Sequence, residues 1–241
     1  SLTGNLIMPG FTAPKVRWLA KHEAANFNKI SKVLLPKDYI RYLLTGNFVS
    51  DMSDAAGTCW LDTKKRDWSD TLLQLCGLNR SHMPALVEGT ESSGTLKESL
   101  SKRWNVPSIT VVGGAGDNAA GAIGSGVTDS GQAMLSLGTS GVIFAVTDDF
   151  VYSPELALHS FCHALPNKWH AMSVHLSAAS CLQWFANIAA NGDVAPLLNE
   201  LNGSSNLPSK STCFFIPYLS GERTPHNDPS LTGRFCNLTH N

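Results

Sequence analysis

The sequence has no long apolar run, almost no net charge and no paired cysteine motif, and each absence excludes a class of protein. No uninterrupted apolar stretch approaches the roughly 20 residues that a membrane-spanning helix needs. No basic start followed by an apolar run marks a secretory signal. The 18 Lys and Arg residues balance 19 Asp and Glu residues, so electrostatics give no reason to expect nucleic acid or an anionic membrane as a partner.

The six cysteines are too few for a small domain that depends on disulfides, and none forms a C-x-x-C pair typical of a zinc site. We therefore expect reduced thiols and a cytoplasmic protein. The 43% of apolar residues and 15% of charged residues are typical of a folded globular chain. The 241 residues allow one large domain or two ordinary ones, at roughly 100–200 residues each.

The first part of the chain predicts helices joined by loops, at residues 14–22, 36–44, 70–76 and 96–104. Pro36 in a first turn and Gly46 just past the last turn mark the second helix. Ser69 is placed to cap the third. This part is therefore expected to be mainly helical.

The second part predicts an α/β arrangement, with strands at 108–112, 132–137, 142–147, 169–176 and 213–219 and a helix at 177–190. The last of these strands is expected to be buried. The change of pattern predicts a domain boundary, with a first domain at 1–110 and a second at 111–241.

Asp117 is the candidate catalytic residue that the pattern itself offers. It follows a predicted strand and the small residues 113–116, and it precedes a helix-like stretch. A carboxylate at the carboxyl end of a strand in an α/β protein is well placed to face a ligand and to act as a general base. The alternative is a helix N-cap that binds backbone amides. The position of Asp117 in the sequence alone gives the general base and the N-cap about equal weight.

A glycine-rich turn, Gly138-Thr139-Ser140-Gly141, lies between two predicted strands and is the second candidate. Such a hairpin can turn several N–H groups inward and bind an anion such as phosphate. The sequence contains neither the Walker pattern nor the Rossmann glycine pattern in its proper context. An ordinary turn is the alternative.

Three further groups give weaker signals. His159 and His163 are four residues apart, a spacing that can hold a metal on a helix, but no third ligand accompanies them. Trp184 can stack on a base or pack in a core. The charged loop at 220–226 can line a cleft or cover the end of a strand. In each case the structural role is the commoner one.

Taken together, seven stretches resemble the FGGY family of sugar kinases nearly from end to end. Residues 10–22 resemble its first signature, with Lys15 and Trp18 at the fixed positions. The other similar stretches are residues 34–46, 53–58, 114–122, 136–146, 159–174 and 217–229. The sequences FCHALP and LSGERTPH favour the branch that phosphorylates xylulose over the glycerol, gluconate and ribulose kinases.

The resemblance implies an actin-like, ribonuclease-H-like α/β fold with parts of two domains and an active site between them. It implies transfer of a phosphoryl group from ATP, with Mg²⁺, to the 5-hydroxyl of D-xylulose. Asp117 matches the catalytic aspartate, and Asn118 would help to hold the sugar. Gly138 and Thr139 match the phosphate-contacting hairpin, and Trp184 would lie near the nucleotide. No complete metal site is visible in the sequence.

The chain departs from the family pattern at both ends. It lacks the upstream phosphate hairpin with its own aspartate, and it stops before the second signature and the adenosine loop. We therefore expect an internal segment with little or no kinase activity alone. Another sugar or polyol kinase, a non-catalytic actin-like module that binds nucleotide and, more weakly, a metal hydrolase stay open. A homodimer is a further option.

Overall fold

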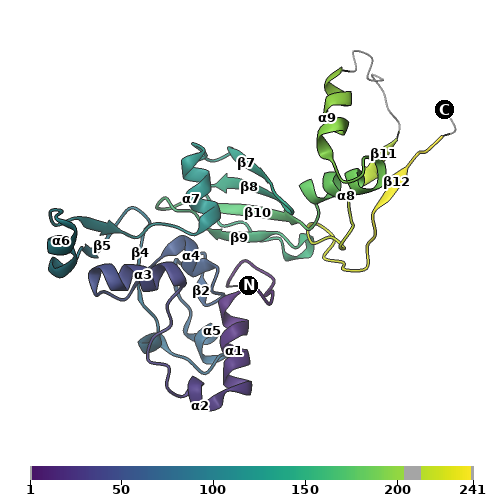
Figure 1. The fold of residues 1–241 in the computed structure, drawn as a ribbon. Coiled ribbons are helices and arrows are strands. Elements are labelled where there is room, and N and C mark those ends of the chain that lie inside the picture. Colours follow the sequence, from purple (N-terminus) through teal and green to yellow (C-terminus); the bar gives the residue numbers. More distant parts are fainter. Residues whose placement is uncertain (1, 204–212, 240–241) are drawn as a thin grey trace. The chain divides into compact units, whose positions relative to one another are not determined.

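The computed structural model describes residues 2–203 and 213–239, and the chain divides into two compact units. Figure 1 labels most of their helices and strands. The first unit comprises Ser1–Ala133, Phe144–Pro154 and His159–Ala171. The second unit comprises Met134–Ile143, Glu155–Leu158 and Met172–Asn241.

Four helices of the first unit confirm the four predicted ones, with ends shifted by one or two residues. They are α1 (Thr12–His22), α3 (Pro36–Thr45), α5 (Asp70–Gln74) and α6 (Glu98–Trp104). Pro36 begins α3, and Gly46 ends it with a φ of 86°, the left-handed conformation that favours glycine. The Ser69 hydroxyl caps α5 by accepting a hydrogen bond from the Leu72 amide at 3.4 Å.

The first unit also contains short elements that the sequence does not reveal. These are α2 (Ala24–Phe27), β1 (Val49–Asp51), α4 (Met52–Ala56), β2 (Leu61–Asp62), β3 (Asp67–Trp68), the 3₁₀ helix η1 (Arg80–His82), β4 (Ala85–Val87) and β5 (Ser92–Thr95). β1 pairs with β4 in parallel, whereas β2 pairs with β3 in antiparallel fashion. Strands of two to four residues are too short to show an alternating pattern, so the prediction of helices and loops alone was incomplete.

The predicted strand at 108–112 is confirmed as β6 (Thr110–Val112), which pairs antiparallel with β5. It leads through residues 113–116 into α7 (Asp117–Gly124). Asp117 therefore stands at a strand-to-helix corner, as the sequence predicts.

Two tryptophans lie in the core of the first unit. Trp60 is fully buried, and its indole N–H donates to Cys76 Sγ at 3.3 Å. The Trp68 indole donates to the Pro84 carbonyl at 2.9 Å. Each ring buries a large apolar area while its one polar atom keeps a partner, which is the usual condition for a buried tryptophan.

A four-stranded sheet is formed by strands in the order β7, β8, β10, β9 (Figure 1). Their bounds are β7 (Ala133–Leu137), β8 (Gly141–Thr147), β10 (Trp169–His175) and β9 (His159–Cys162), and the short 3₁₀ helix η2 (Pro154–Leu156) precedes β9. The three predicted strands of this region are confirmed. His159 lies on a strand, so the interpretation of His159 and His163 as a metal pair on a helix is wrong.

The buried histidines near this sheet pack against aromatic rings. The ring of His170 stacks on Phe144 with 3.9 Å between centroids, and His163 meets Phe144 edge-on at 5.6 Å. Burial lowers the pKa of His170 to about 3 and lowers the pKa of His163 as well. Within residues 2–203 and 213–239, no group of three His, Cys, Asp or Glu residues could hold a metal ion.

The described part of the second unit includes two α-helices and an antiparallel pair of short strands after the sheet. They are α8 (Ala179–Ala189), α9 (Val194–Gly203), β11 (Phe214–Ile216) and β12 (Arg234–Cys236). α8 confirms the predicted helix at 177–190. β11 is shorter than the predicted strand, and Phe214 is 55% exposed, so the prediction of a buried strand is wrong. No helix in the described ranges is long and apolar enough to cross a membrane.

Candidate active site

Glycines shape the segment of the first unit that leads into Asp117. A Cβ at Gly113 would lie 2.5 Å from the Glu88 carbonyl oxygen, so no other residue fits without a backbone shift. Gly114 has a φ of +72°, a backbone angle that residues other than glycine rarely adopt. Gly116 is the N-cap of α7 and has no side chain to supply a capping bond. The sharp turn after β6 therefore depends on glycine at defined positions.

Asp117 is the first helical residue of α7, and its side chain is exposed. Its Oδ1 accepts hydrogen bonds from the Asn118 amide at 2.8 Å and from Asn118 Nδ2 at 3.2 Å. The alternative of an N-cap is wrong, because Gly116 holds that position. A carboxylate in the first turn of a helix is stabilised by the positive end of the helix dipole. The structure thus exposes the Asp117 carboxylate to solvent at the corner between β6 and α7.

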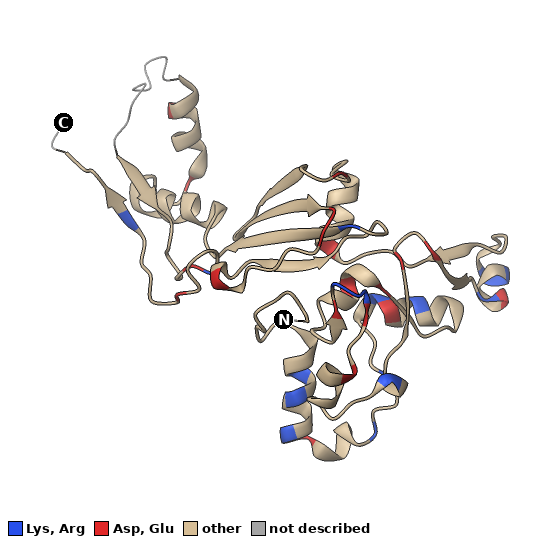
Figure 2. Ribbon diagram, turned by 180° about the vertical axis from the view of Figure 1, so that it is seen from behind, with Lys and Arg blue, Asp and Glu red and all other residues tan. Residues whose placement is uncertain are grey.

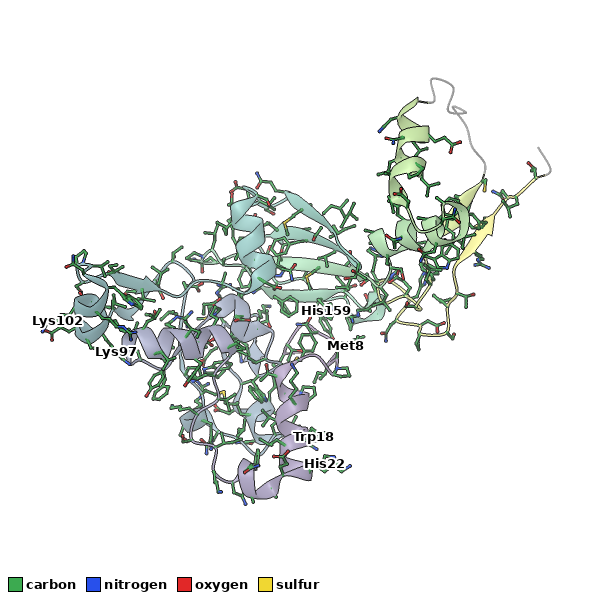
Figure 3. All side chains as sticks on the ribbon, in the orientation of Figure 1. Met8, Trp18, His22, Lys97, Lys102 and His159 are labelled. Carbon is green, nitrogen blue, oxygen red and sulfur yellow. The ribbon has the colours of Figure 1, made fainter. Side chains whose placement is uncertain are left out.

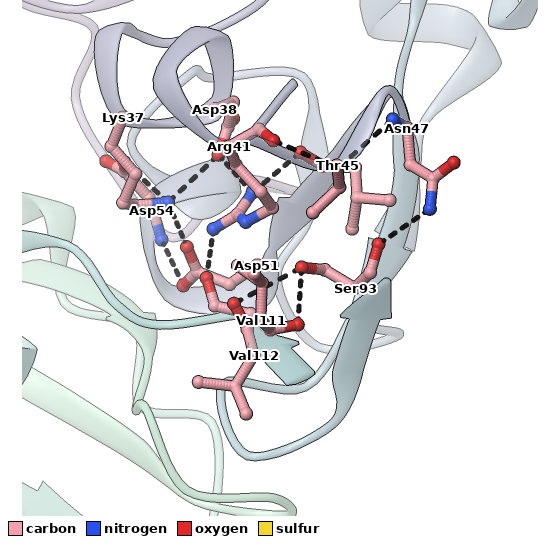
Figure 4. A network of polar contacts seen from close by, with 12 residues as sticks. Lys37, Asp38, Arg41, Thr45, Asn47, Asp51, Asp54, Ser93, Val111 and Val112 are labelled. Carbon is pink, nitrogen blue, oxygen red and sulfur yellow. Dashed lines mark hydrogen bonds and ion pairs between the residues drawn. The ribbon is translucent and has the colours of Figure 1, made fainter. Parts of the chain in front are cut away.

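Buried and half-buried charged residues of the first unit form a polar network (Figure 4) that reaches the segment before Asp117 through Arg41. Arg41 on α3 donates to Asp38 Oδ1 and to the Val49 carbonyl, both at 2.7 Å, and it also donates to the Gly113 carbonyl. Lys37 Nζ lies 3.0 Å from Asp38 Oδ1 and 3.2 Å from Asp54 Oδ2.

The pKa shifts of this cluster follow from its burial and its charges. Burial raises the pKa of the Asp54 carboxyl, and the nearby Lys37 ammonium offsets that only in part. Burial alone would lower the pKa of Lys37, but the carboxylates around it, Asp51 above all, raise it above its usual value. Lys37 therefore stays charged, and the cluster is an ion-pair network rather than a set of neutral groups.

An apolar hollow of about 260 Å³ lies beside the same corner, also within the first unit. Its walls include Gly89, Gly114, Ala120 on α7 and Ala164. Asp117 does not line it. The hollow is therefore a neighbour of the corner rather than a pocket around the carboxylate.

The glycine-rich turn of the second unit is held by backbone hydrogen bonds. The carbonyls of Gly138 and Thr139 accept from the amides of Ala179 and Ala178, each at 2.9 Å. The Ser180 hydroxyl also donates to the Thr139 carbonyl, at 2.8 Å. The turn is therefore fastened to the N-terminus of α8, and the first amides of that helix are occupied by its carbonyls.

Trp184 packs in an aromatic cluster of the second unit. Its ring stacks on Phe215 with 5.3 Å between centroids and 13° between planes. Phe235 lies 6.5 Å away, and Phe185 meets Phe235 at 6.2 Å. Trp184 therefore packs against other aromatic rings, and its place near the nucleotide stays a prediction.

Glu222 in the charged loop is buried, with 1% of its area exposed. Its Oε1 accepts from the amides of Leu176 and Arg223, at 3.1 and 2.7 Å. Its Oε2 has His175 Nδ1 at 3.4 Å. This loop therefore closes over the end of β10 within the second unit, in agreement with the structural alternative.

The residues of the first signature lie on α1, away from the corner. Trp18 is 55% exposed, and its ring stacks on His22 at 5.0 Å (Figure 3). The same helix carries the basic residues Lys15, Arg17 and Lys21, and Figure 2 shows the basic residues of this helix in blue. The structure gives these residues no contact with Asp117.

The predicted site residues are distributed over both units. Asp117 and Asn118 belong to the first unit, whereas Gly138, Thr139 and Trp184 belong to the second. Their meeting in one active site stays a prediction. Sequence reasoning missed the side chains that hold the Asp117 corner, chiefly Arg41. The one available signal was the density of acidic and basic residues between positions 37 and 54.

Two family models together match nearly the whole chain. The N-terminal domain of the FGGY family of carbohydrate kinases matches residues 1–124, and its C-terminal domain matches residues 133–241. Asp117 thus falls within the first match. The predicted division at residue 110 stays a prediction.

Named relatives agree with the family models. The chain is 57% identical over 239 residues to a xylulose kinase of Escherichia coli K12 and 56% identical to one of Klebsiella pneumoniae, in each case over 99% of this chain and 49% of the relative. The crystal structure of a xyloylose kinase from Brucella ovis superimposes with a TM-score of 0.94 at 52% identity, covering 99% of this chain and 49% of the other.

The chain spans about half the length of the curated relatives that it matches. The structural neighbours are sugar kinases of the actin-like ATPase fold, so the predicted α/β fold class is confirmed. With both domain models matched, the chain belongs to the FGGY family of carbohydrate kinases.

Proposed function

We propose that the full-length protein transfers the γ-phosphoryl group of ATP to the 5-hydroxyl of D-xylulose. The observation that carries this proposal is the 57% identity, over 99% of this chain, to a protein named xylulose kinase. The exposed Asp117 carboxylate at a rigid strand-to-helix corner supports it. Phosphoryl transfer needs mainly positioning and charge neutralisation, and both suit such a corner.

Asp117 is the proposed general base. It takes the proton of the sugar hydroxyl as that oxygen bonds to the γ-phosphorus, and the bond between γ-phosphorus and the bridging oxygen breaks to release ADP. General-base catalysis of this kind is typically worth about 10²–10⁴ in rate. Asn118 is proposed to help hold the sugar. Its amide and side-chain nitrogen already donate to Asp117 and orient the carboxylate.

The glycine-rich turn of the second unit is the proposed phosphate contact. Gly138 and Thr139 match the hairpin that contacts phosphate in the family that the chain resembles, and the bonds from their carbonyls to the amides of Ala179 and Ala178 hold this turn in place. Trp184 on α8 is proposed to lie near the nucleotide.

ATP is the proposed phosphate donor, and Mg²⁺ is proposed to accompany it. Magnesium prefers oxygen ligands and is usually held by one or two carboxylates together with the phosphates of the substrate. Since no group of three His, Cys, Asp or Glu residues in the described part of the chain could hold the ion, the phosphates of ATP and water would supply most of its ligands. When bound, Mg²⁺ would neutralise charge on the phosphates.

We further propose residues 1–110 as the end of the sugar-side domain and 111–241 as the start of the nucleotide-side domain. The buried thiols of Cys59 and Cys162 support a cytoplasmic protein. A homodimer is proposed as the alternative to a monomer, and sedimentation of the full-length protein distinguishes the two.

An ADP-release assay of the full-length protein with xylulose, ribulose, gluconate and glycerol tests the proposal. We expect turnover with D-xylulose to exceed turnover with the other three. Preference for another of these substrates would overturn xylulose as the proposed substrate but would leave the proposed kinase activity standing. Nucleotide binding without turnover on any of them would favour the non-catalytic module. The 241-residue chain alone is expected to show little or no turnover.

A further inference from the structure

The segment before Asp117 is held from both sides by side chains distant in sequence. Arg41 on α3 donates to the carbonyl of Gly113, at the start of the segment. The Ser53 hydroxyl on α4 accepts from the amide of Gly116, at its end, with 2.9 Å between nitrogen and oxygen. Both partners are buried, Arg41 with 4% and Ser53 with 7% of their area exposed.

Ser53 is itself fixed by a buried carboxylate. Its hydroxyl donates to Asp51 Oδ2, which also accepts from the Ser53 and Asp54 amides at 3.0 and 3.2 Å. Asp51 is completely buried and pairs with Lys37. With its proton committed to Asp51, the hydroxyl can offer only a lone pair toward Gly116. The Gly116 amide can only donate, so the Ser53 hydroxyl accepts from Gly116 and donates to Asp51.

This arrangement compensates for the glycines of the turn. A segment with three glycines in four residues loses much conformational entropy when it is ordered. No capping side chain is available at Gly116 to hold the first turn of α7. The Ser53 hydroxyl on α4 instead accepts a hydrogen bond from the Gly116 amide, and Gly116 directly precedes Asp117.

We propose that Ser53, oriented by Asp51, is a positioning residue for the general base Asp117. This inference rests on the proposed function. The role requires no contact between Ser53 and substrate. Ser53 fixes the Gly116 peptide, and that peptide fixes where α7 begins and hence where the Asp117 carboxylate points. A displacement of about 1 Å at a reacting group can cost about 100-fold in rate.

The test compares Ser53→Ala, Ser53→Thr and Ser50→Ala in the full-length protein. Ser50→Ala is the matched control, because Ser50 lies three residues away, is 1% exposed and has no hydrogen-bond partner for its hydroxyl among the described residues. We expect Ser53→Ala to lower kcat by about 10- to 100-fold with the KM for D-xylulose changed by less than about threefold. Ser53→Thr keeps the hydroxyl and should recover most of kcat, and Ser50→Ala should leave kcat unchanged.

Amide hydrogen exchange gives a readout that does not depend on catalysis. Protection of the Gly116 amide should fall in Ser53→Ala and persist in Ser53→Thr and Ser50→Ala. Unchanged kcat or unchanged Gly116 protection in Ser53→Ala, while Asp117→Asn is inactive, would overturn this inference alone. Full activity of Asp117→Asn would instead overturn the proposed base and this inference with it.

Discussion

The two units of the chain are stabilised in different ways. Among the described residues, all but one of the largest fully buried side chains belong to the first unit, and the exception is Glu222 in the second. The Asp117 corner is held by buried side chains such as Arg41 and Ser53. The turn at 138–141 is held mainly by backbone bonds to the start of α8. Truncating a buried side chain should therefore lower the stability of the first unit most. Replacing a glycine of the turn by a larger residue should lower the stability of the second unit.

The largest stability effect should come from Arg41→Met. The change removes a buried cation that pairs with Asp38 and leaves the Val49 and Gly113 carbonyls without their donor. Loss of one partner of a buried pair typically costs about 3–5 kcal/mol. Denaturant unfolding, followed by hydrogen exchange to separate the two units, should show this loss in the first unit.

The matched control is Arg80→Met on the surface of the same unit. Arg80 donates to both oxygens of Asp67, at 3.0 and 2.8 Å, and also to Asp70 Oδ1 at 2.9 Å and to the Trp68 carbonyl at 2.6 Å. About half of the Arg80 side chain and of the two carboxylate side chains is exposed, however. Exposed pairs are typically worth about 0.2–1 kcal/mol. Equal losses in Arg41→Met and Arg80→Met would contradict the assignment of a buried network to the corner.

A smaller effect is expected from Gly141→Val in the second unit. A Cβ at Gly141 would lie 3.1 Å from Ala178 Cβ, so a larger side chain must push the turn away from α8. Overpacking of this kind typically costs about 1–3 kcal/mol. At Gly138 the nearest atom to an added Cβ is 3.6 Å away, so Gly138→Ala should change stability by less than about 0.5 kcal/mol. Hydrogen exchange of α8 compares the two variants, and equal effects would refute the steric account.

The smallest effect is a dependence of the first unit on pH. The pKa of buried His170 is lowered to about 3 from an ordinary value of 6.5, so the unfolded chain takes up a proton at a higher pH than the folded chain does. Stability is full above about pH 6.5 and is lost as the pH falls from there toward about 3. Between pH 8 and pH 6 we expect a loss of about 1 kcal/mol. His170→Phe should remove this part of the pH dependence, and an unchanged profile would contradict it.

Local signals in the sequence predicted the longer elements well. Pro36 and Gly46 set the bounds of α3 through properties of their own backbone, and Ser69 did so for α5 through one hydroxyl. Asp117 was placed at a strand-to-helix corner from the small residues before it. Each of these features depends on neighbours within a few positions of the chain, which is why a single sequence reveals them.

Contacts between distant residues could not be predicted in this way. Arg41 and Gly113 are 72 positions apart, and Ser53 and Gly116 are 63 apart. Glu222 belongs to a charged loop whose sequence does not reveal that this carboxylate is buried, with two backbone amides donating to one of its oxygens. Nothing local distinguishes such residues from solvated ones, since burial is decided by the fold.

Asp117→Asn in the full-length protein tests the central claim most directly, with ADP release and ATP binding measured in parallel. The substitution keeps the size of the side chain but removes the base. We predict a loss of about 10²–10⁴-fold in kcat with D-xylulose and ATP affinity close to that of the unaltered protein. Turnover within a few-fold of the unaltered protein would contradict the assignment of Asp117 as the base.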